Sequence, residues 1–197
     1  KSGLILTDTD LPPGDVETKY RIVAFPFILA SNTVGDIFNQ LGTMVKDWRV
    51  FHYQPPGPTA TKWKQSNLLL PGQGYWVIRR NGTDISVLGD TQGTTVAATL
   101  AQPFTVDLAA GWNQIGNPYL FNVLWSDVKT ASNVTFALRT YNGAFSDADK
   151  LNKFEGGFVF AAASTTLKFP VAKNPAAGGR TSATAKSGKT NAIDGPE

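Results

Sequence analysis

The sequence predicts a mainly β protein, a pseudo-two-fold duplicated sandwich or barrel with one or two short helices. Short aromatic and β-branched runs alternate with turns rich in Gly, Pro and Asn, as is typical of all-β domains. Only 17% of the residues are charged, while five Trp and twelve Phe supply the apolar area that a core needs. The third observation is an internal repeat, since the same series of blocks occurs twice along the chain.

Four blocks of the first half recur in the same order in the second half. Both copies open with an aromatic-led strand that runs into Pro and another aromatic residue, at residues 20–27 and 112–119. The other matches are 48–53 with 136–141, 74–77 with 156–159, and 85–87 with 167–169. The offset falls from 92 to 88 to 82 residues, and the losses fall in loops, where deletions are tolerated.

The repeat sets the expected domain organisation. We expect a single β-rich domain over residues 1–170, made of two diverged copies at about residues 20–88 and 104–170. One copy alone would bury little apolar area, so the two copies are expected to share one core. Residues 171–197 have the Gly, Ala, Ser, Thr and Lys composition of a flexible linker or tail toward a following domain.

Each copy is predicted as a strand, a short helix and then three strands. The first strand ends at Pro26 or Pro118, because Pro has no N–H to donate to a ladder. Thr33 is a suitable N-cap for a helix over residues 34–41. The second copy has a shorter candidate helix around residues 125–129.

Alternation predicts which way the side chains of the next strand point. Along residues 48–53 they fall on two faces, with Trp48, Val50 and His52 on one and Arg49, Phe51 and Tyr53 on the other. The following strand covers residues 75–79, and Asn81-Gly82 is expected to form a hairpin turn into residues 85–88.

Three motifs resemble a repeat found in large secreted or cell-surface bacterial proteins. They are Gly111-Trp112-Asn113-Gln114-Ile115-Gly116-Asn117-Pro118, Tyr141-Asn142-Gly143-Ala144-Phe145 and Pro71-Gly72-Gln73-Gly74-Tyr75-Trp76-Val77. Each copy departs from the pattern, with Tyr20-Arg21-Ile22 at the opening of the first and Phe154-Glu155-Gly156-Gly157-Phe158 at the close of the second. The resemblance implies an extracellular, multidomain surface protein. It implies no activity, cofactor or catalytic residue.

A search for catalytic or metal chemistry identifies no catalytic residues and no cofactor, so we expect a protein that is not an enzyme. His52 is the single histidine and Cys is absent, which disfavours a transition-metal site. Asp147 and Asp149 lie in a predicted loop and are weak candidates for Ca²⁺ ligands, the alternative being a solvated turn. The tail supplies most of the net charge of +3, so no basic face for nucleic acid is expected.

Aromatic residues are the candidates for ligand contact: Trp63, Tyr53 and Trp48. Trp63 follows a Pro/Gly loop between two lysines, which favours exposure, but Phe145 occupies the matching place in the second copy, which favours packing. Trp48, Trp76, Trp112 and Trp125 are also expected in the core.

Two functions remain open: a structural or interaction module, acting as spacer or adhesive domain, and a carbohydrate-binding module with aromatic platforms. The expected partners are neighbouring domains of the same precursor, with polysaccharide or another surface protein as further possibilities. We expect no membrane insertion, since no apolar run is long enough.

Overall fold

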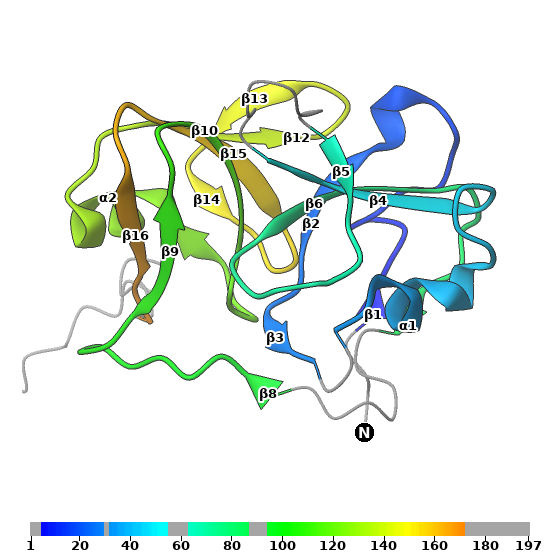
Figure 1. Cartoon of the computed structure of the whole chain (residues 1–197), viewed down its shortest axis with the longest axis horizontal. Helices are drawn as coiled ribbons and strands as arrows, with labels where there is room; N and C mark the ends of the chain where they lie inside the picture. The colour runs from blue at the N-terminus through cyan, green and yellow to red at the C-terminus, as the bar shows by residue number, and fades with distance from the viewer. Residues whose placement is uncertain (1–4, 30–31, 55–62, 87–93, 172–197) are drawn as a thin grey trace, which may run out of the picture.

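A computed structural model of the chain describes residues 5–29, 32–54, 63–86 and 94–171, and these fold mainly into antiparallel strands with two short α-helices (Figure 1). No described sheet closes on itself, so the architecture is sandwich-like and not a barrel. The predicted fold class is therefore confirmed. The linker predicted for residues 171–197 lies outside the described residues except for Val171.

The first copy is built on a four-stranded sheet with strand order β2-β6-β4-β5. Its strands are β2 (Arg21–Ala24), β6 (Gly74–Arg79), β4 (Trp48–Tyr53) and β5 (Trp63–Gln65). The copy is completed by the ladders β1 (Ile5–Leu6) with β7 (Ile85–Ser86) and β3 (Phe27–Ile28) with β8 (Thr94–Thr95), by α1 (Val34–Phe38), and by the 3-10 turns η1 (Glu17–Lys19) and η2 (Asn39–Leu41).

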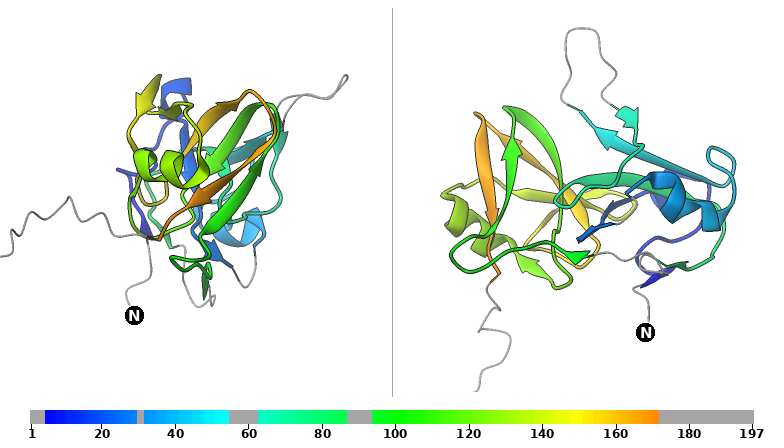
Figure 2. Two further views of the ribbon diagram at one scale, coloured as in Figure 1. Left: turned by 90° about the vertical axis from the view of Figure 1, so that its left-hand side faces the viewer. Right: turned by 60° about the horizontal axis from the view of Figure 1, so that its bottom comes forward.

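The second copy repeats this arrangement with the order β10-β15-β12-β13. Its strands are β10 (Gly111–Gly116), β15 (Gly156–Ala161), β12 (Leu138–Tyr141) and β13 (Phe145–Ala148). The accompanying elements are β9 (Phe104–Leu108) with β16 (Thr165–Phe169), β11 (Val123–Leu124) with β14 (Lys150–Leu151), and α2 (Trp125–Ser132). The copies lie side by side, with α1 and α2 toward opposite ends of the molecule (Figures 1 and 2).

Strand register makes the equivalence exact at the level of residues. Tyr53 pairs with Trp63 at the end of the β4–β5 hairpin, and Tyr141 pairs with Phe145 at the end of β12–β13. On the other side of the same strands, Val50 lies opposite Val77 and Leu138 opposite Val159. The structure thus places the same residues in equivalent positions as the sequence match did.

The first predicted helix is confirmed, including its cap. The Thr33 hydroxyl accepts a hydrogen bond from the Asp36 N–H at 3.3 Å, and the 3-10 turn carries the helical path to Leu41. Gly42 follows with a φ of 108°, a conformation that glycine adopts without strain. The second helix is longer than predicted, because it runs on to Ser132 and ends at Asn133 in the left-handed region.

The buried apolar residues form two clusters, one in each copy, and not the single shared core expected from the sequence. The cluster of the first copy contains Phe25, Phe38, Trp48 and Tyr75 among others. The cluster of the second contains Ile115, Trp125, Val128 and Phe169 among others. Phe154 is the exception, since it belongs to the second copy but packs in the first cluster, 6.4 Å from Phe27 between ring centroids.

Reciprocal backbone contacts join the copies about a pseudo-two-fold axis. The Ala24 N–H donates to the Phe154 carbonyl at 2.8 Å, and the equivalent Gly116 N–H donates to the Gly72 carbonyl at 2.9 Å. Gly72 and Phe154 both have positive φ, 77° and 64°, although Phe rarely adopts such a conformation. The burial of the Phe154 ring offsets the cost of this backbone strain.

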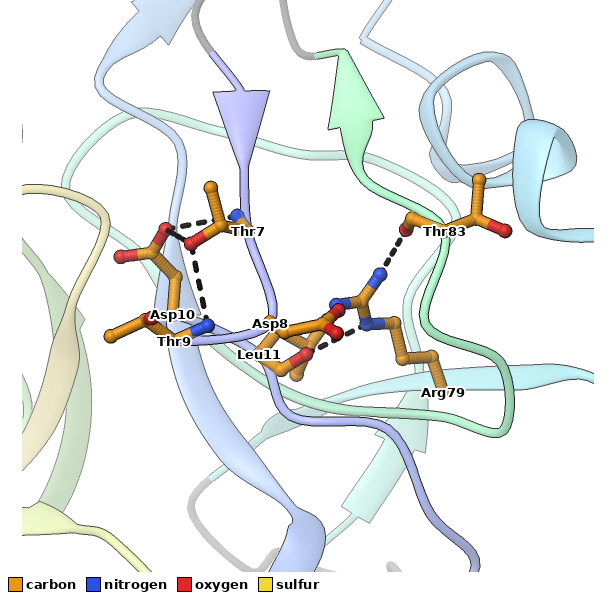
Figure 3. Close-up of polar contacts among 7 residues, drawn as sticks. All are labelled: Thr7, Asp8, Thr9, Asp10, Leu11, Arg79 and Thr83. Carbon is orange, nitrogen blue, oxygen red and sulfur yellow. Dashed lines mark hydrogen bonds and ion pairs between the residues drawn. The ribbon is translucent and has the colours of Figure 1, made fainter.

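A buried arginine ties the N-terminal segment to the first sheet (Figure 3). Arg79 is 1% exposed; its guanidinium donates to the carbonyls of Leu11 and Thr83 and pairs with the Asp8 carboxylate. Nearby, Asp10 accepts hydrogen bonds from the N–H and hydroxyl of Thr7, each at 3.0 Å, and closes a turn. These acidic residues therefore have structural partners.

Candidate binding site

The four-stranded sheets carry aromatic side chains on the faces that do not line the two cores. In β6, Tyr75 and Val77 enter the first core, so the intervening Trp76 points to the other face. In β15, Val159 and Ala161 enter the second core, and Phe158 points away in the same manner. Together with neighbouring rings these side chains form one aromatic cluster: Tyr20, Tyr53, Trp63, Trp76, Trp112, Tyr141, Phe145, Phe158 and Phe160.

The aromatic cluster crosses from one copy to the other through equivalent ring pairs. Tyr53 of the first copy lies 5.5 Å from Phe158 of the second, and Tyr141 of the second lies 4.7 Å from Trp76 of the first. Both pairs are edge-to-face, with interplanar angles of 81° and 70°. This geometry is favourable for aromatic rings, so the cluster stabilises the contact between the copies.

Two open clefts border the aromatic cluster, and they are counterparts under the pseudo-two-fold. The first has a volume of about 530 Å³ and is lined by Glu17, Tyr20, Phe51, Trp63, Trp76 and Tyr141. The second has a volume of about 220 Å³ and is lined by Tyr53, Trp63, Trp112, Arg139, Phe145 and Phe158. Trp112, Phe145, Phe158 and Tyr53 hold the positions of Tyr20, Trp63, Trp76 and Tyr141 in the first cleft.

The clefts differ in charge at one equivalent position. Phe51 lines the first cleft, and Arg139 takes its place in the second. The Arg139 guanidinium carbon lies 5.9 Å from the centroid of the Phe145 ring, and its Nε lies 3.4 Å from an oxygen of Asp147. The smaller cleft therefore contains a cation of the protein itself, whereas the described lining of the larger one contains no basic residue.

Two of the three predicted ligand-contacting residues lie in this site. Trp63 is 44% exposed and lines both clefts, and Tyr53 packs against it with ring centroids 5.4 Å apart. Trp48 lies elsewhere, because it is 2% exposed in the first core and its Nε1 donates to the Gly42 carbonyl. Its indole is therefore part of the core and does not reach the clefts.

The expected burial of the other tryptophans holds only in part. Trp125 is buried as expected, whereas Trp76 is half-buried in the aromatic cluster and Trp112 is 39% exposed. The sequence did contain a signal for their role. Four equivalent pairs of the cluster are aromatic in both copies, whereas the counterpart of Phe160 is Ile78: Tyr20 and Trp112, Tyr53 and Tyr141, Trp63 and Phe145, Trp76 and Phe158. A ring at the same outward-facing position of both copies indicates a role outside the cores.

Three side-chain polar atoms are buried without a hydrogen-bond partner among the described residues: His52 Nδ1, Trp76 Nε1 and Gln114 Nε2. Gln114 still joins the copies, because its Oε1 accepts the Tyr53 N–H at 2.7 Å. Burial lowers the pKa of His52, and the neighbouring Lys64 lowers it further. Both effects favour the neutral imidazole, and no ion pair joins His52 to a carboxylate among the described residues.

Of the two acidic residues proposed as calcium ligands, Asp147 is placed differently from the prediction. Asp147 lies in strand β13, opposite Arg139, and not in a loop. Asp149 follows that strand, and its carbonyl accepts the Trp125 N–H at 2.7 Å. Across the described residues no group of three or more His, Cys, Asp or Glu side chains is arranged to hold a metal ion.

A separate, polar cleft of about 340 Å³ is lined by residues of both copies, and its charged groups already have partners in the fold. Arg21 donates to the carbonyls of Thr18 and Tyr20, and Glu155 accepts the N–H of Asn152 at 2.8 Å. These groups are therefore engaged, and the aromatic clefts remain the stronger candidate for ligand binding.

No family model, curated protein or solved structure matches this chain. Among the described helices, none has the length and apolar character needed to cross a membrane.

Proposed function

We propose that this chain is a non-enzymatic interaction module that binds its ligand at the exposed rim of the aromatic cluster. The observation that carries the proposal is the gathering of large exposed rings at one site. Trp63, Trp112, Phe145 and Phe160 are each 39–49% exposed and all belong to the aromatic cluster. Contiguous exposed apolar surface on a folded domain is typical of a binding site, and Trp is enriched where binding energy concentrates.

The setting we propose is a larger exported protein of a bacterial surface, in which this module is a spacer or adhesive domain. That setting rests on the resemblance of its motifs to repeats of secreted bacterial proteins. Its partners would be neighbouring domains of the same precursor, together with a polysaccharide or another surface protein that reaches the aromatic cluster.

Tryptophan fluorescence during titration with candidate ligands tests the proposal. Trp48 and Trp125 are buried in the cores, so a saturable change reports mainly on the rings of the aromatic cluster. The change should disappear in Trp63→Ala and persist in Leu100→Ala, which removes an apolar side chain that is 80% exposed outside the cluster. An equal loss in both variants, or binding unaffected by Trp63→Ala, would contradict the proposal.

The second candidate is a carbohydrate-binding module, and the exposed indoles of Trp63 and Trp112 favour it, since an aromatic face stacks on a sugar ring. The ring pairs around Trp63 are edge-to-face, at 69° to Tyr53 and 76° to Trp76, and form no flat platform. A panel of soluble polysaccharides separates the candidates: one glycan that saturates the signal favours this function, and a response restricted to proteins or small cations disfavours it.

A further inference from the structure

We propose that the first aromatic cleft binds an organic cation, such as a quaternary ammonium group or the charged end of a Lys or Arg side chain. The inference rests on the proposed function and assigns the chemistry of the ligand at the same site. Three features carry it: the arrangement of the rings, the charge of the lining, and the occupant of the counterpart cleft.

Three rings of the first cleft pack around Trp76, each at a steep angle to its indole. Tyr20, Trp63 and Tyr141 lie 5.9, 5.8 and 4.7 Å from it between centroids, at interplanar angles of 82°, 76° and 70°. Rings set at steep angles to one another present their faces in different directions, where coplanar rings would offer a flat platform. Aromatic faces carry negative electrostatic potential and attract a cation placed within about 6 Å of the ring centre.

The charge of the lining agrees with a cationic ligand. Glu17 lines the first cleft together with five aromatic residues. Arg21 is the arginine nearest to Glu17 in the sequence, and it donates to the carbonyls of Thr18 and Tyr20. It lines the separate polar cleft, together with Asp10 and Glu155. The described lining thus combines aromatic rings with a carboxylate, which together favour a cation over a neutral or anionic group.

The counterpart cleft shows what this ring framework accommodates. There, the Arg139 guanidinium lies over Phe145, with Asp147 as its carboxylate partner. Phe145 is equivalent to Trp63, and Arg139 is equivalent to Phe51. Among the described residues that line the first cleft, none is a cation, the cleft is larger, and a stronger cation-binding ring replaces Phe. An external cation would therefore take the role that Arg139 has in the second copy.

The test uses the whole chain and two small probes that share one shape. Choline chloride supplies the quaternary ammonium group, and 3,3-dimethylbutan-1-ol is its neutral carbon counterpart. The indole N–H signals of Trp63 and Trp76 should shift saturably with choline and not with the neutral alcohol at the same concentrations. Equal responses to both probes would overturn the inference. The absence of any response to both choline and the second cation described next would overturn it as well.

A second cation distinguishes the source of the ligand. N-acetyl-arginine amide presents the side chain that a protein partner would offer. Tighter binding of choline points to a small molecule or head group, and tighter binding of the arginine derivative points to a cationic segment of a partner protein. Either result supports the cation class, because both depend on the same cleft.

Phe51→Arg is the sharpest variant, because it gives the first cleft the internal cation of the second. Cation binding should be lost in this variant while the far-UV circular dichroism stays unchanged. Phe51→Leu removes one ring without adding a charge and should weaken binding only on the order of two- to fivefold. Glu17→Gln should weaken it on the order of three- to tenfold through loss of one charge interaction. Leu100→Ala, outside the aromatic cluster, should leave the affinity unchanged. Full binding in Phe51→Arg would contradict the proposed position.

The inference and the proposed function fail in different ways. If a polysaccharide or protein ligand shifts the Trp63 signal while both cations leave it unchanged, the proposed interaction module is supported and the proposed cationic ligand is wrong. If ligands bind the chain without any change at Trp63 or in Trp63→Ala, both proposals are wrong.

Discussion

Gly74 and Gly156 lie against each other where the two copies meet, 3.1 Å from the Cα of Gly74 to the position that a Gly156 side chain would take. A Cβ on Gly74 would lie 2.5 Å from the Ile115 carbonyl oxygen, which belongs to the backbone of the other copy. A backbone neighbour cannot move aside as the end of a flexible side chain can. The Gly-x-Gly motif therefore has a steric reason in the pairing of the copies.

We expect Gly74→Ala to lower the free energy of unfolding by about 2–3 kcal/mol, because overpacking at a rigid contact costs this much. Gly35→Ala is the matched control. Gly35 lies in α1 with its nearest neighbour at an ordinary 3.5 Å, so Ala should stabilise the helix by about 0.5–1 kcal/mol. Urea denaturation measures both changes, and a neutral Gly74→Ala would show that the contact between the copies is loose.

His52 gives the stability a pH dependence of defined sign. Its pKa in the folded chain lies below that of an unfolded imidazole, near ~6.5, so the unfolded state binds the proton more readily. The stability due to neutral His52 is present above the pKa of the unfolded state and is lost as the pH falls through the pKa of the folded state. The wild-type chain should therefore lose more stability than His52→Gln between pH 7 and pH 5 in urea denaturation. Parallel curves for the two proteins would contradict this assignment.

At the scale of elements, the sequence signals that were strongest were local ones. The Thr33 cap and the alternation along β4 depend on neighbouring residues, and the structure follows both of them. The strand β13 was expected as a loop, because its polar residues 146–147 carry no apolar alternation. It forms as the partner of β12, and pairing across a hairpin is not visible in a single strand's composition.

The candidate site was harder to predict because it is made between elements. Trp63 and Tyr53 were found from their local context, whereas the contribution of Trp76 depends on which face of β6 meets the second copy. That choice is made by the packing of the whole sheet. The cross-copy contacts of Tyr141 likewise follow from the pseudo-two-fold axis and not from the residues beside it.

Arg79 connects the turn at Thr7–Leu11 to β6, so removal of its guanidinium should free the turn from the strand. We expect Arg79→Met to lower the free energy of unfolding by about 2–4 kcal/mol, since the buried carbonyl of Leu11 and the part-buried bond to the Thr83 carbonyl lose their donor. Arg80→Met changes an exposed neighbour and should stay within about 0.5 kcal/mol. Faster hydrogen exchange at the Leu11 amide, which donates to the Thr7 carbonyl, would report the release of the turn directly.

At the scale of the whole molecule, two separate cores and a shared aromatic cluster raise the question whether the copies unfold together or separately. Phe154 packs in the first core, and the reciprocal bonds of Ala24 and Gly116 cross between the copies. These links should make the copies one cooperative unit. Native-state hydrogen exchange of β6 and β15 should then give opening free energies within about 1 kcal/mol of each other. A larger difference would mean that the copies open independently.

The reciprocal bonds also have the form of an isologous homodimer, in which each subunit gives and receives the same contact. In a true homodimer every substitution appears on both sides of the axis, so the two clefts must change together. Covalent joining removes that restriction and replaces concentration-dependent association by an intramolecular one with an effective concentration on the order of millimolar. Phe51 and Arg139 occupy equivalent positions of the two clefts and differ in this way. Two copies in one chain can therefore differ, so that one half has an open cleft while a side chain of the other half occupies its own.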